Sequence, residues 1–275
     1  MSDPSLAPEL VRRYLAALGV APAKPSLAAL RELVAAQLMR VPFENISKLY
    51  NRKRHGLTGL PPLQIYLEGI ERYHFGGTCY SNNFYFYSLL ASLGYDAKLC
   101  GADMSVPDVH AVCMAAVDGR EYLIDAGYAA PVLSPMPRDL ATDFVVELGR
   151  DRFVLRPQDA NGHSRLDLYR DGQLIHGYLA KPAPKRIEDF RGAIAASFKP
   201  DATFLNSLLL TRFYPDRAVM VHNFTLVESR AGHSTICPLA SPDQLVAAIE
   251  RHFDTPRSIV AEAVNELGDL QDSWT

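Results

Sequence analysis

The chain lacks a strong net charge, a long apolar run and an N-terminal leader pattern. Its 28 Lys and Arg residues nearly balance 31 Asp and Glu residues, and the formal net charge of −3 gives no electrostatic reason to expect binding to nucleic acid or to an anionic membrane. No apolar stretch approaches the ~20 residues that a membrane-spanning helix needs. The first residues lack the basic segment and apolar core of a signal peptide. We therefore expect no nucleic-acid or membrane partner.

Cysteine is also scarce, and its spacing is not that of a metal site. The four cysteines form no Cys-x-x-Cys pair and are not accompanied by a His-x-x-x-His pair, so we expect no bound metal. Unpaired cysteines suit a reducing compartment, which predicts a cytoplasmic protein. Cys100, Cys113 and Cys237 lie in or beside apolar runs, and we interpret them as small buried hydrophobic residues.

The composition does provide material for a hydrophobic core. Of the 275 residues, 48% are hydrophobic, which is typical of a globular protein. A chain of this length can form one large domain or two to three small ones. There are no internal repeats or low-complexity runs, so repeat architectures are excluded.

The first third of the chain has helical periodicity. An apolar stripe over residues 6–18 stops at Gly19, and Ser26 is placed to cap a second helix over residues 27–38. The short basic run at residues 52–55 is interpreted as a solvated loop. We therefore predict that the N-terminal part is a bundle of helices.

From about residue 97 to 180 the period shortens to that of strands. Asp118-Gly119 and Asp171-Gly172 indicate tight turns between strands. After residue 184 we expect a short helix at 187–196, strands at 204–213, 219–228 and 233–238, and two closing helices capped by Ser241-Pro242 and Thr255-Pro256. Helical, strand-rich and mixed segments thus follow one another along the chain.

The most informative segment places Cys79 after a glycine pair and at the start of a predicted helix. Gly76 and Gly77 precede it, polar residues follow, and the apolar stretch 84–93 ends at Gly94, a residue type common at helix C-termini. A thiol at a helix N-terminus lies at the positive end of the macrodipole, which favours the thiolate. These features make Cys79 the candidate nucleophile.

A candidate base and a candidate carboxylate follow downstream. His110 begins the apolar run 111–117, and Asp125 ends the next run. Two strands joined at Asp118-Gly119 would bring His110 and Asp125 side by side. A cysteine, a base and a carboxylate that orients the base form the arrangement of an activated sulfur nucleophile.

These motifs resemble those of the arylamine N-acetyltransferase family. The matching positions are Gly76, Gly77, Cys79 and Asn83 for the family's Arg-Gly-Gly-x-Cys-x-x-x-Asn, Pro42 to Asn45 for its Pro-Phe-Glu-Asn, and His110 with Asp125 to Tyr128 for its His and Asp-x-Gly-Phe. The resemblance extends from about residue 4 to 267. Each motif alone is weak, but together, in this order and with this spacing, they are specific.

The resemblance implies an α+β fold with a Cys-His-Asp core like that of cysteine proteases and transglutaminases. Residues 1–95 would form a helical bundle that carries the catalytic Cys79. Residues 96–184 would form a small β-barrel that carries His110 and Asp125, and residues 185–275 an α/β lid.

The resemblance also implies the activity. An acetyl group would move from acetyl-CoA to Cys79 as a thioester, and then to an aromatic amine, hydroxylamine or hydrazine, in a ping-pong scheme. Phe43, Tyr80 and Tyr128 match positions that line the acceptor pocket. Gly127 and Ala129 match the loop that approaches the CoA pyrophosphate.

The sequence departs from the family pattern at three places. Phe75 replaces the arginine before the glycine pair, Ser81 replaces an acidic residue, and the glycine-rich loop after Asp125 contains Ala129 and Ala130. Fewer glycines imply a less close approach of this loop to phosphate groups.

The lost arginine leaves Glu44 of the Pro-Phe-Glu-Asn motif without the counter-charge that the family provides. A carboxylate that is buried without a partner is costly and tends to protonate. Either another cation (Arg72, His74 or Arg40) replaces the arginine, or Glu44 is more exposed than it is in the family.

Two other classes of function stay open at this point. The same triad could serve an amide synthase that takes a carrier-bound or longer acyl thioester, or a transglutaminase- or protease-like hydrolase. A catalytically silent binding protein on this fold is the third hypothesis.

Overall fold

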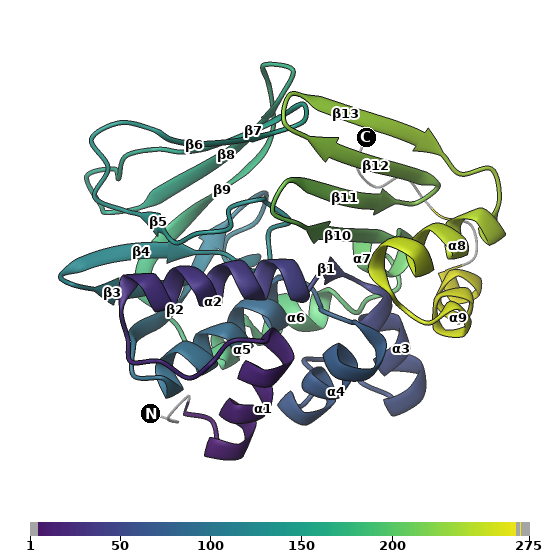
Figure 1. The fold of residues 1–275 in the computed structure, drawn as a ribbon, viewed down its shortest axis with the longest axis horizontal. Helices are drawn as coiled ribbons and strands as arrows, with labels where there is room; N and C mark the ends of the chain where they lie inside the picture. Colours follow the sequence, from purple (N-terminus) through teal and green to yellow (C-terminus); the bar gives the residue numbers. More distant parts are fainter. Residues whose placement is uncertain (1–4, 268–269, 271–275) are drawn as a thin grey trace.

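The computed structural model describes residues 5–267 and residue 270, which form an α+β protein (Figure 1). The N-terminal part is helical, as predicted, with α1 (Pro8–Leu18), α2 (Leu27–Arg40), α3 (Ile46–His55), α4 (Leu63–Tyr73) and α5 (Cys79–Ser92). Gly19 ends α1 in the left-handed conformation, with φ of 67°. The Ser26 side chain caps α2 by accepting a hydrogen bond from the Ala29 N–H at 3.1 Å.

The basic run at residues 52–55 is helical, so the prediction of a solvated loop is wrong. The run forms the last turn of α3, where cations interact favourably with the helix dipole. Its side chains form ion pairs with Glu262 and Glu266 of the C-terminal helix α9 (Arg257–Leu267). These pairs connect the N-terminal helices to the far end of the chain.

The middle of the chain folds into an eight-stranded antiparallel sheet that curves into a nearly closed barrel (Figure 1). Its strands are β2 (Asp96–Asp103), β3 (His110–Val117), β4 (Arg120–Ile124), β5 (Met136–Pro137), β6 (Phe144–Leu148), β7 (Asp151–Leu155), β8 (Ser164–Arg170) and β9 (Gln173–Pro184). Their spatial order is β5-β4-β3-β2-β9-β8-β7-β6. Both predicted tight turns are confirmed, since Asp118 and Gly119 join β3 to β4 with φ of 52° and 76°, and Asp171 and Gly172 join β8 to β9 with φ of 50° and 82°.

A second antiparallel sheet combines the C-terminal strands with one short strand from the N-terminal region. Its order is β1 (Phe43–Glu44), β10 (Leu209–Phe213), β11 (Arg217–His222), β12 (Thr225–Arg230) and β13 (His233–Pro238). Two strand predictions are wrong. Residues 203–206 form the short helix α7 (Thr203–Asn206), and the predicted strand 219–228 is interrupted by a turn at Asn223, with φ of 47°. Asn tolerates this left-handed conformation, so the turn signal was present but lay inside an apolar run.

The remaining helices agree with the sequence pattern. η1 (Ile187–Phe190) and α6 (Arg191–Ala196) follow the barrel, and α8 (Pro242–Phe253), capped by the Ser241 side chain, precedes α9. One apolar core lies between the N-terminal helices and the barrel, one lies inside the barrel, and one joins α3 to the second sheet and to α8 and α9. β2 begins at Asp96 and β9 ends at Pro184, and the division into three domains stays a prediction.

Cys100 and Cys113 are buried in the barrel, as predicted. Cys237 is exposed on β13, at the edge of its sheet, so its interpretation as a buried residue is wrong. Within residues 5–267, no helix combines the length and the apolar character needed to cross a bilayer.

Candidate active site

Cys79 is the first residue of α5 and follows a tightly packed glycine loop. The loop runs beside β1: the Gly77 N–H donates to the Pro42 carbonyl at 3.3 Å, and the Glu44 N–H donates to the Gly77 carbonyl at 3.1 Å. A Cβ at Gly76 would lie only 1.9 Å from the Pro42 oxygen. The close approach of the two backbone segments therefore requires glycine at this position. The loop leads directly into α5 and so places the Cys79 thiol beside the first-turn N–H groups, which have no partner within the helix.

The β3–β4 hairpin brings His110 and Asp125 together as predicted. His110 begins β3, Asp125 directly follows β4, and the register pairs Cys113 with Ile124. His110 Nε2 lies 2.7 Å from Asp125 Oδ2, and both residues are buried. Because Nε2 faces the carboxylate, Nδ1 is the ring nitrogen left to interact with the Cys79 side chain, which helps to raise the pKa of His110.

Asn83 holds the carboxylate, a role that the sequence analysis did not assign although the residue stood in the matched motif. It lies one helical turn after Cys79 and is fully buried. Its Nδ2 donates to Asp125 Oδ1 at 2.8 Å and to the Ala111 carbonyl at 2.7 Å, while its Oδ1 accepts from the Ala126 N–H at 2.8 Å. The helix that carries the thiol is thus hydrogen-bonded directly to β3, which carries His110, and to the segment after β4 that contains Asp125.

The electrostatics of the buried pair favour an ionised His110. Burial alone would lower the pKa of His110, but Asp125 and Cys79 outweigh it, so this pKa is raised. Burial likewise acts to raise the pKa of Asp125, but His110, Asn83 and the Gly127 N–H lower it below its ordinary value. The stable form is an imidazolium–carboxylate pair, and an imidazolium beside Cys79 stabilises a thiolate there.

The aromatic residues predicted to line the acceptor pocket occupy three different positions. Phe43 is buried in β1 beside Gly77 and packs on Phe204, with ring centroids 5.8 Å apart. The Tyr80 hydroxyl donates to the Val109 carbonyl at 2.8 Å and so tethers the residue before His110. Tyr80 also lines a pocket beside Cys79, described below.

Tyr128 lies beside the His110–Asp125 pair rather than free in a pocket. Its ring centroid is 5.9 Å from that of His110, and its hydroxyl is 2.8 Å from His176 Nδ1. The centroid of the Tyr178 ring lies 5.0 Å from that of His110 and 5.0 Å from that of Tyr128. Both rings pack against the imidazole, which is buried.

The two loop residues predicted to contact CoA have different surroundings. A Cβ at Gly127 would lie 2.5 Å from Cys79 Cα, so this glycine is required by contact with the start of α5. Ala129 has a φ of 58°, a left-handed conformation that is unusual for a residue with a Cβ. It lines a groove between the barrel and the second sheet, together with Phe213 and Arg150. Their contact with CoA stays a prediction.

Glu44 is 2% exposed, and neither alternative considered for its lost counter-charge holds. Its Oε2 accepts from the Ser47 N–H at 2.8 Å and its Oε1 from the Gly76 N–H at 3.0 Å, and within the described chain no cation pairs with it. Burial raises its pKa, although these hydrogen bonds oppose the shift. Phe75, in the place of the family arginine, is buried in an aromatic cluster. Backbone N–H groups have taken the role of the cation.

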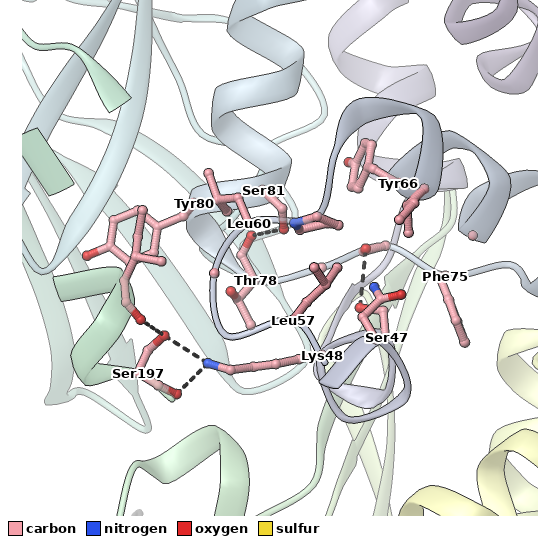
Figure 2. A pocket seen from close by; sticks show the side chains of 18 of the residues that line it. Ser47, Lys48, Leu57, Leu60, Tyr66, Phe75, Thr78, Tyr80, Ser81 and Ser197 are labelled. Atoms are coloured by element: carbon pink, nitrogen blue, oxygen red, sulfur yellow. Dashed lines mark hydrogen bonds between the residues drawn. The ribbon is translucent and has the colours of Figure 1, made fainter. Parts of the chain in front are cut away.

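A pocket opens beside Cys79, between α3, the 57–61 loop, the glycine loop and α6 (Figure 2). Its cavity volume is about 40 Å³, well below the roughly 300–1,000 Å³ of small-molecule sites. Thr78 and Tyr80, on either side of Cys79, both line it. Leu60 and Phe198 belong to its wall and also to the apolar cluster that Cys79 joins. The pocket therefore adjoins the start of α5, although Cys79 itself is not among its lining residues.

Among the described residues, one cationic side chain lines this pocket, and the sequence analysis missed it. Lys48, on α3, points its ammonium at Ser197 on the opposite wall (Figure 2). Burial lowers its pKa to about 8, while Cys79 acts in the opposite direction. Lys48 follows the Pro-Phe-Glu-Asn motif by three residues, and this short separation was the available signal.

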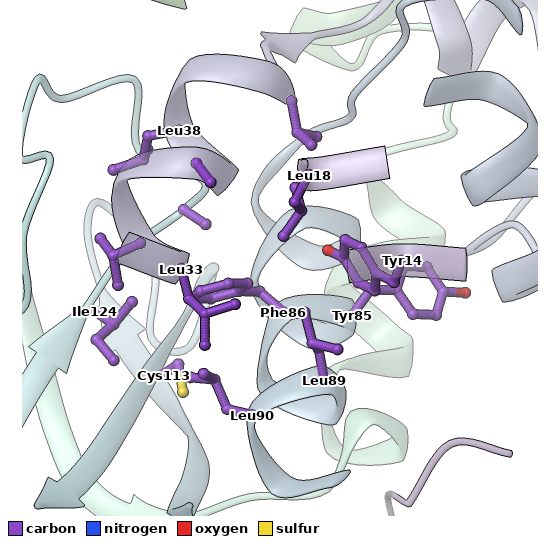
Figure 3. Packing of buried hydrophobic residues seen from close by; sticks show 14 of the residues in the cluster. Tyr14, Leu18, Leu33, Leu38, Tyr85, Phe86, Leu89, Leu90, Cys113 and Ile124 are labelled. Atoms are coloured by element: carbon purple, nitrogen blue, oxygen red, sulfur yellow. The ribbon is translucent and has the colours of Figure 1, made fainter. Parts of the chain in front are cut away.

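α5 is held firmly by its apolar face (Figure 3). Phe86, Leu89 and Leu90 are fully buried, and they pack with Leu33 of α2 and Cys113 of β3. This packing sets the distance between the helix start and the β3–β4 hairpin. Over the described residues, no group of three or more His, Cys, Asp or Glu side chains is arranged to hold a metal.

The same architecture occurs in known proteins. A family model described as N-acetyltransferase matches residues 26–256. The chain belongs to the arylamine N-acetyltransferase family. As a member of this family it is an acyltransferase enzyme. The arylamine N-acetyltransferase of Mycolicibacterium smegmatis is 24% identical to it over 264 residues, which cover 90% of this chain and 88% of that protein.

Solved arylamine N-acetyltransferase structures share the fold over almost the whole chain. The Nocardia farcinica enzyme matches with a TM-score of 0.77 at 26% identity, covering 100% of this chain and 99% of that one. The Mycobacterium marinum enzyme, solved in complex with CoA, matches with a TM-score of 0.77 at 19% identity, covering 94% and 99%. This arylamine N-acetyltransferase family member is therefore divergent in sequence and close in fold.

Proposed function

We propose that this protein transfers an acetyl group from acetyl-CoA to an aromatic amine, hydroxylamine or hydrazine through a thioester on Cys79. The observation that carries the proposal is the buried His110–Asp125 pair, 2.7 Å apart, whose imidazole contacts the Cys79 side chain at the N-terminus of α5. The family relationship supports the same reaction, and the M. marinum relative binds CoA.

The first half-reaction begins from the thiolate–imidazolium pair, in which His110 already holds the proton of the Cys79 thiol, and the thiolate attacks the carbonyl carbon of the acyl thioester. The negative oxygen of the tetrahedral intermediate is stabilised by N–H groups of the first turn of α5, including that of Cys79. The C–S bond to CoA then breaks, and His110 returns its proton to the departing thiol. The product is acetyl-Cys79 and free CoA.

In the second half-reaction the amine nitrogen attacks the acetyl carbon. His110 takes a proton from the nitrogen, and the C–S bond to Cys79 breaks, which restores the thiolate–imidazolium pair and releases the amide. Asp125 keeps Nε2 of His110 occupied throughout, so that Nδ1 is the atom that exchanges protons. Phe43, Tyr80 and Tyr128 would surround the acceptor, and the Gly127–Ala129 loop would face the donor.

The test is a pre-steady-state burst. Mixing the enzyme with acetyl-CoA in the absence of an amine should release one equivalent of free thiol and leave one acetyl group on Cys79, located by peptide mass spectrometry. A burst with longer or carrier-bound acyl thioesters but not with acetyl-CoA would contradict the proposed donor. Acetylation at a residue other than Cys79 would contradict the mechanism.

A further inference from the structure

A half-buried histidine that the proposed reaction does not use lies one side chain away from His110. Nδ1 of His176, on β9, is 2.8 Å from the Tyr128 hydroxyl, and the two rings stack with their centroids 5.6 Å apart at an interplanar angle of 25°. Tyr128 in turn packs on His110 at 62°, with ring centroids 5.9 Å apart. His176 is thus connected to His110 through a single tyrosine side chain.

β9 presents two side chains to Tyr128. His176 and Tyr178 are two residues apart in a stretch where β9 pairs regularly with β8, so both project from the same face of the strand. The Tyr178 ring lies at 87° to that of Tyr128, with centroids 5.0 Å apart. A Cβ at Gly177, between the two residues, would lie 2.7 Å from the Leu166 oxygen, so the pairing of β8 and β9 requires glycine here. The strand is therefore tightly held at the point where it contacts Tyr128.

Tyr128 itself belongs to the irregular segment that follows β4. Gly127 before it packs against the Cys79 backbone and donates its N–H to Asp125 Oδ1 at 2.9 Å. Ala129 after it has the left-handed conformation, with φ of 58°, which is unfavourable for a residue with a Cβ. A hydrogen bond from the Tyr128 side chain to a strand therefore helps to hold this segment, and with it the Gly127 N–H that binds Asp125.

The protonation states of the two groups suit this hydrogen bond. Burial raises the pKa of Tyr128, so its hydroxyl keeps its proton. Burial and the charge on His110 lower the pKa of His176, so the His176 ring is neutral near pH 7. A neutral imidazole has one ring nitrogen that accepts, and Nδ1 faces the hydroxyl that donates. The motif that this segment matches has Phe in the place of Tyr128, and a Phe would leave His176 Nδ1 without this donor.

We propose that His176 is a positioning residue, whose hydrogen bond holds the Tyr128 ring against His110 and so keeps the imidazole in place beside Cys79. This inference rests on the Cys79–His110 pair of the proposed function, but not on the identity of the acyl donor or of the acceptor. Without the bond, Tyr128 is free to turn away and water reaches the imidazole. Water raises the local dielectric constant and therefore weakens the attraction between imidazolium and thiolate.

The test is the pH–rate profile of Cys79 alkylation by iodoacetamide. Peptide mass spectrometry identifies the modified cysteine, because Cys237 is also exposed. A change in the accessibility of the thiol alters the plateau rate, whereas a change in its pairing with His110 alters the midpoint of the profile. His176→Leu and Tyr128→Phe should each move the midpoint to higher pH by about half a unit to one unit, a weakening of the thiolate–imidazolium pair by about three- to tenfold, as expected for one hydrogen bond.

Three further variants separate positioning from stability. The double variant Tyr128→Phe/His176→Leu should shift the midpoint no further than the larger single shift, since both substitutions remove the same bond. His176→Gln, whose side-chain amide can accept from the Tyr128 hydroxyl, should retain most of the wild-type midpoint. His163→Leu is the matched control, because this histidine hydrogen-bonds Asp159, in the loop before β8, and it should leave the midpoint unchanged.

A wild-type midpoint in His176→Leu would overturn the proposal. Shifts that add in the double variant would also overturn it, because the two side chains would then act separately, and so would equal shifts in His176→Leu and His176→Gln. If thermal unfolding shows that His176→Leu is not folded, Tyr128→Phe decides, since it removes a single oxygen atom and an unshifted midpoint would refute the role of the bond. A missing thiol burst with acetyl-CoA would contradict the proposed donor without changing these midpoints, so the two proposals fail separately.

Discussion

Replacing Asn83 by Ala is the perturbation that tests most directly how the His110–Asp125 pair is held. The substitution removes three hydrogen bonds of a fully buried side chain: two that it donates, to Asp125 and to the Ala111 carbonyl, and one that it accepts from the Ala126 N–H. The bond to the ionised carboxylate is worth roughly 1.5–3 kcal/mol, and each neutral group left unpaired costs roughly 1–3 kcal/mol. Allowing for relaxation, we expect the free energy of unfolding to fall by about 3–5 kcal/mol, out of a total of roughly 5–15 kcal/mol.

The neighbouring Asn82 provides a matched control. It is equally buried on the same helix and also forms three hydrogen bonds, to the Pro42 and Gly77 carbonyls and from the Tyr66 hydroxyl, but none to the catalytic pair. Asn82→Ala should therefore cost a comparable amount of stability. Only Asn83→Ala should change the chemistry at Asp125.

The pH dependence of Cys79 acylation distinguishes the two variants. The pKa of Asp125 is lower in the folded protein than in the unfolded chain. The ionised carboxylate therefore stabilises the fold at pH values above its pKa in the unfolded chain, and this stabilisation is lost as the pH falls through its pKa in the folded protein. Because Asn83 is one cause of the depression, Asn83→Ala should move the acid limb of the burst-rate profile to higher pH. Asn82→Ala should leave this limb in place. Coincident acid limbs in the two variants would refute the role that we assign to Asn83.

The other predictions concern the triad and the donor loop. Cys79→Ser should abolish acyl transfer while the circular dichroism spectrum stays native, because a hydroxyl is a far weaker nucleophile than a thiolate; activity above a few per cent of wild type would exclude Cys79 as the nucleophile. His110→Ala should slow the alkylation of Cys79 by iodoacetamide, and most strongly at about pH 6. At this pH the wild-type enzyme has the imidazolium of His110, whereas a free thiol of pKa ~8.5 is almost fully protonated. Superimposable pH–rate profiles of the two proteins would show that His110 is not the partner of Cys79. We expect the Michaelis constant for acetyl-CoA to be near or above millimolar, because the methyl group of Ala129 beside the pyrophosphate removes a charge-assisted hydrogen bond. Such a bond is worth roughly 1.5–3 kcal/mol, a factor of about ten to a hundred in binding. Ala129→Gly should therefore lower this Michaelis constant. An unchanged constant would mean that this loop does not contact the donor.

Local sequence signals predicted most of the elements around the site. The glycine pair and the apolar stretch after Cys79 indicated α5, and Asp118-Gly119 indicated the hairpin that pairs His110 with Asp125. Such signals are reliable because they depend on backbone geometry within a few residues: helix ends, positive φ and strand periodicity. The turn at Asn223 was missed because a single residue carried its signal inside an apolar run.

The surroundings of Glu44 show where local reasoning ends. The motif indicated a carboxylate near the site, and charge balance predicted either a replacement cation or exposure. The folded chain instead brings the Gly76 N–H, 32 residues away, to one carboxylate oxygen, while the nearby Ser47 N–H binds the other. No pattern in a linear sequence encodes which backbone N–H groups will converge on a buried oxygen.

The sequence by itself determined most of the elements, the identity of the candidate triad and the resemblance to the family, because these depend on residue types at short, regular spacings. Only the tertiary structure decided what surrounds the triad. Asn83 was shown to bind Asp125, and Lys48 was placed across the pocket from Ser197, 149 residues away. Such contacts arise from the packing of α3, α5 and α6 around one cavity, and their energies depend on burial and on distances of about 3 Å, which no spacing along the chain specifies.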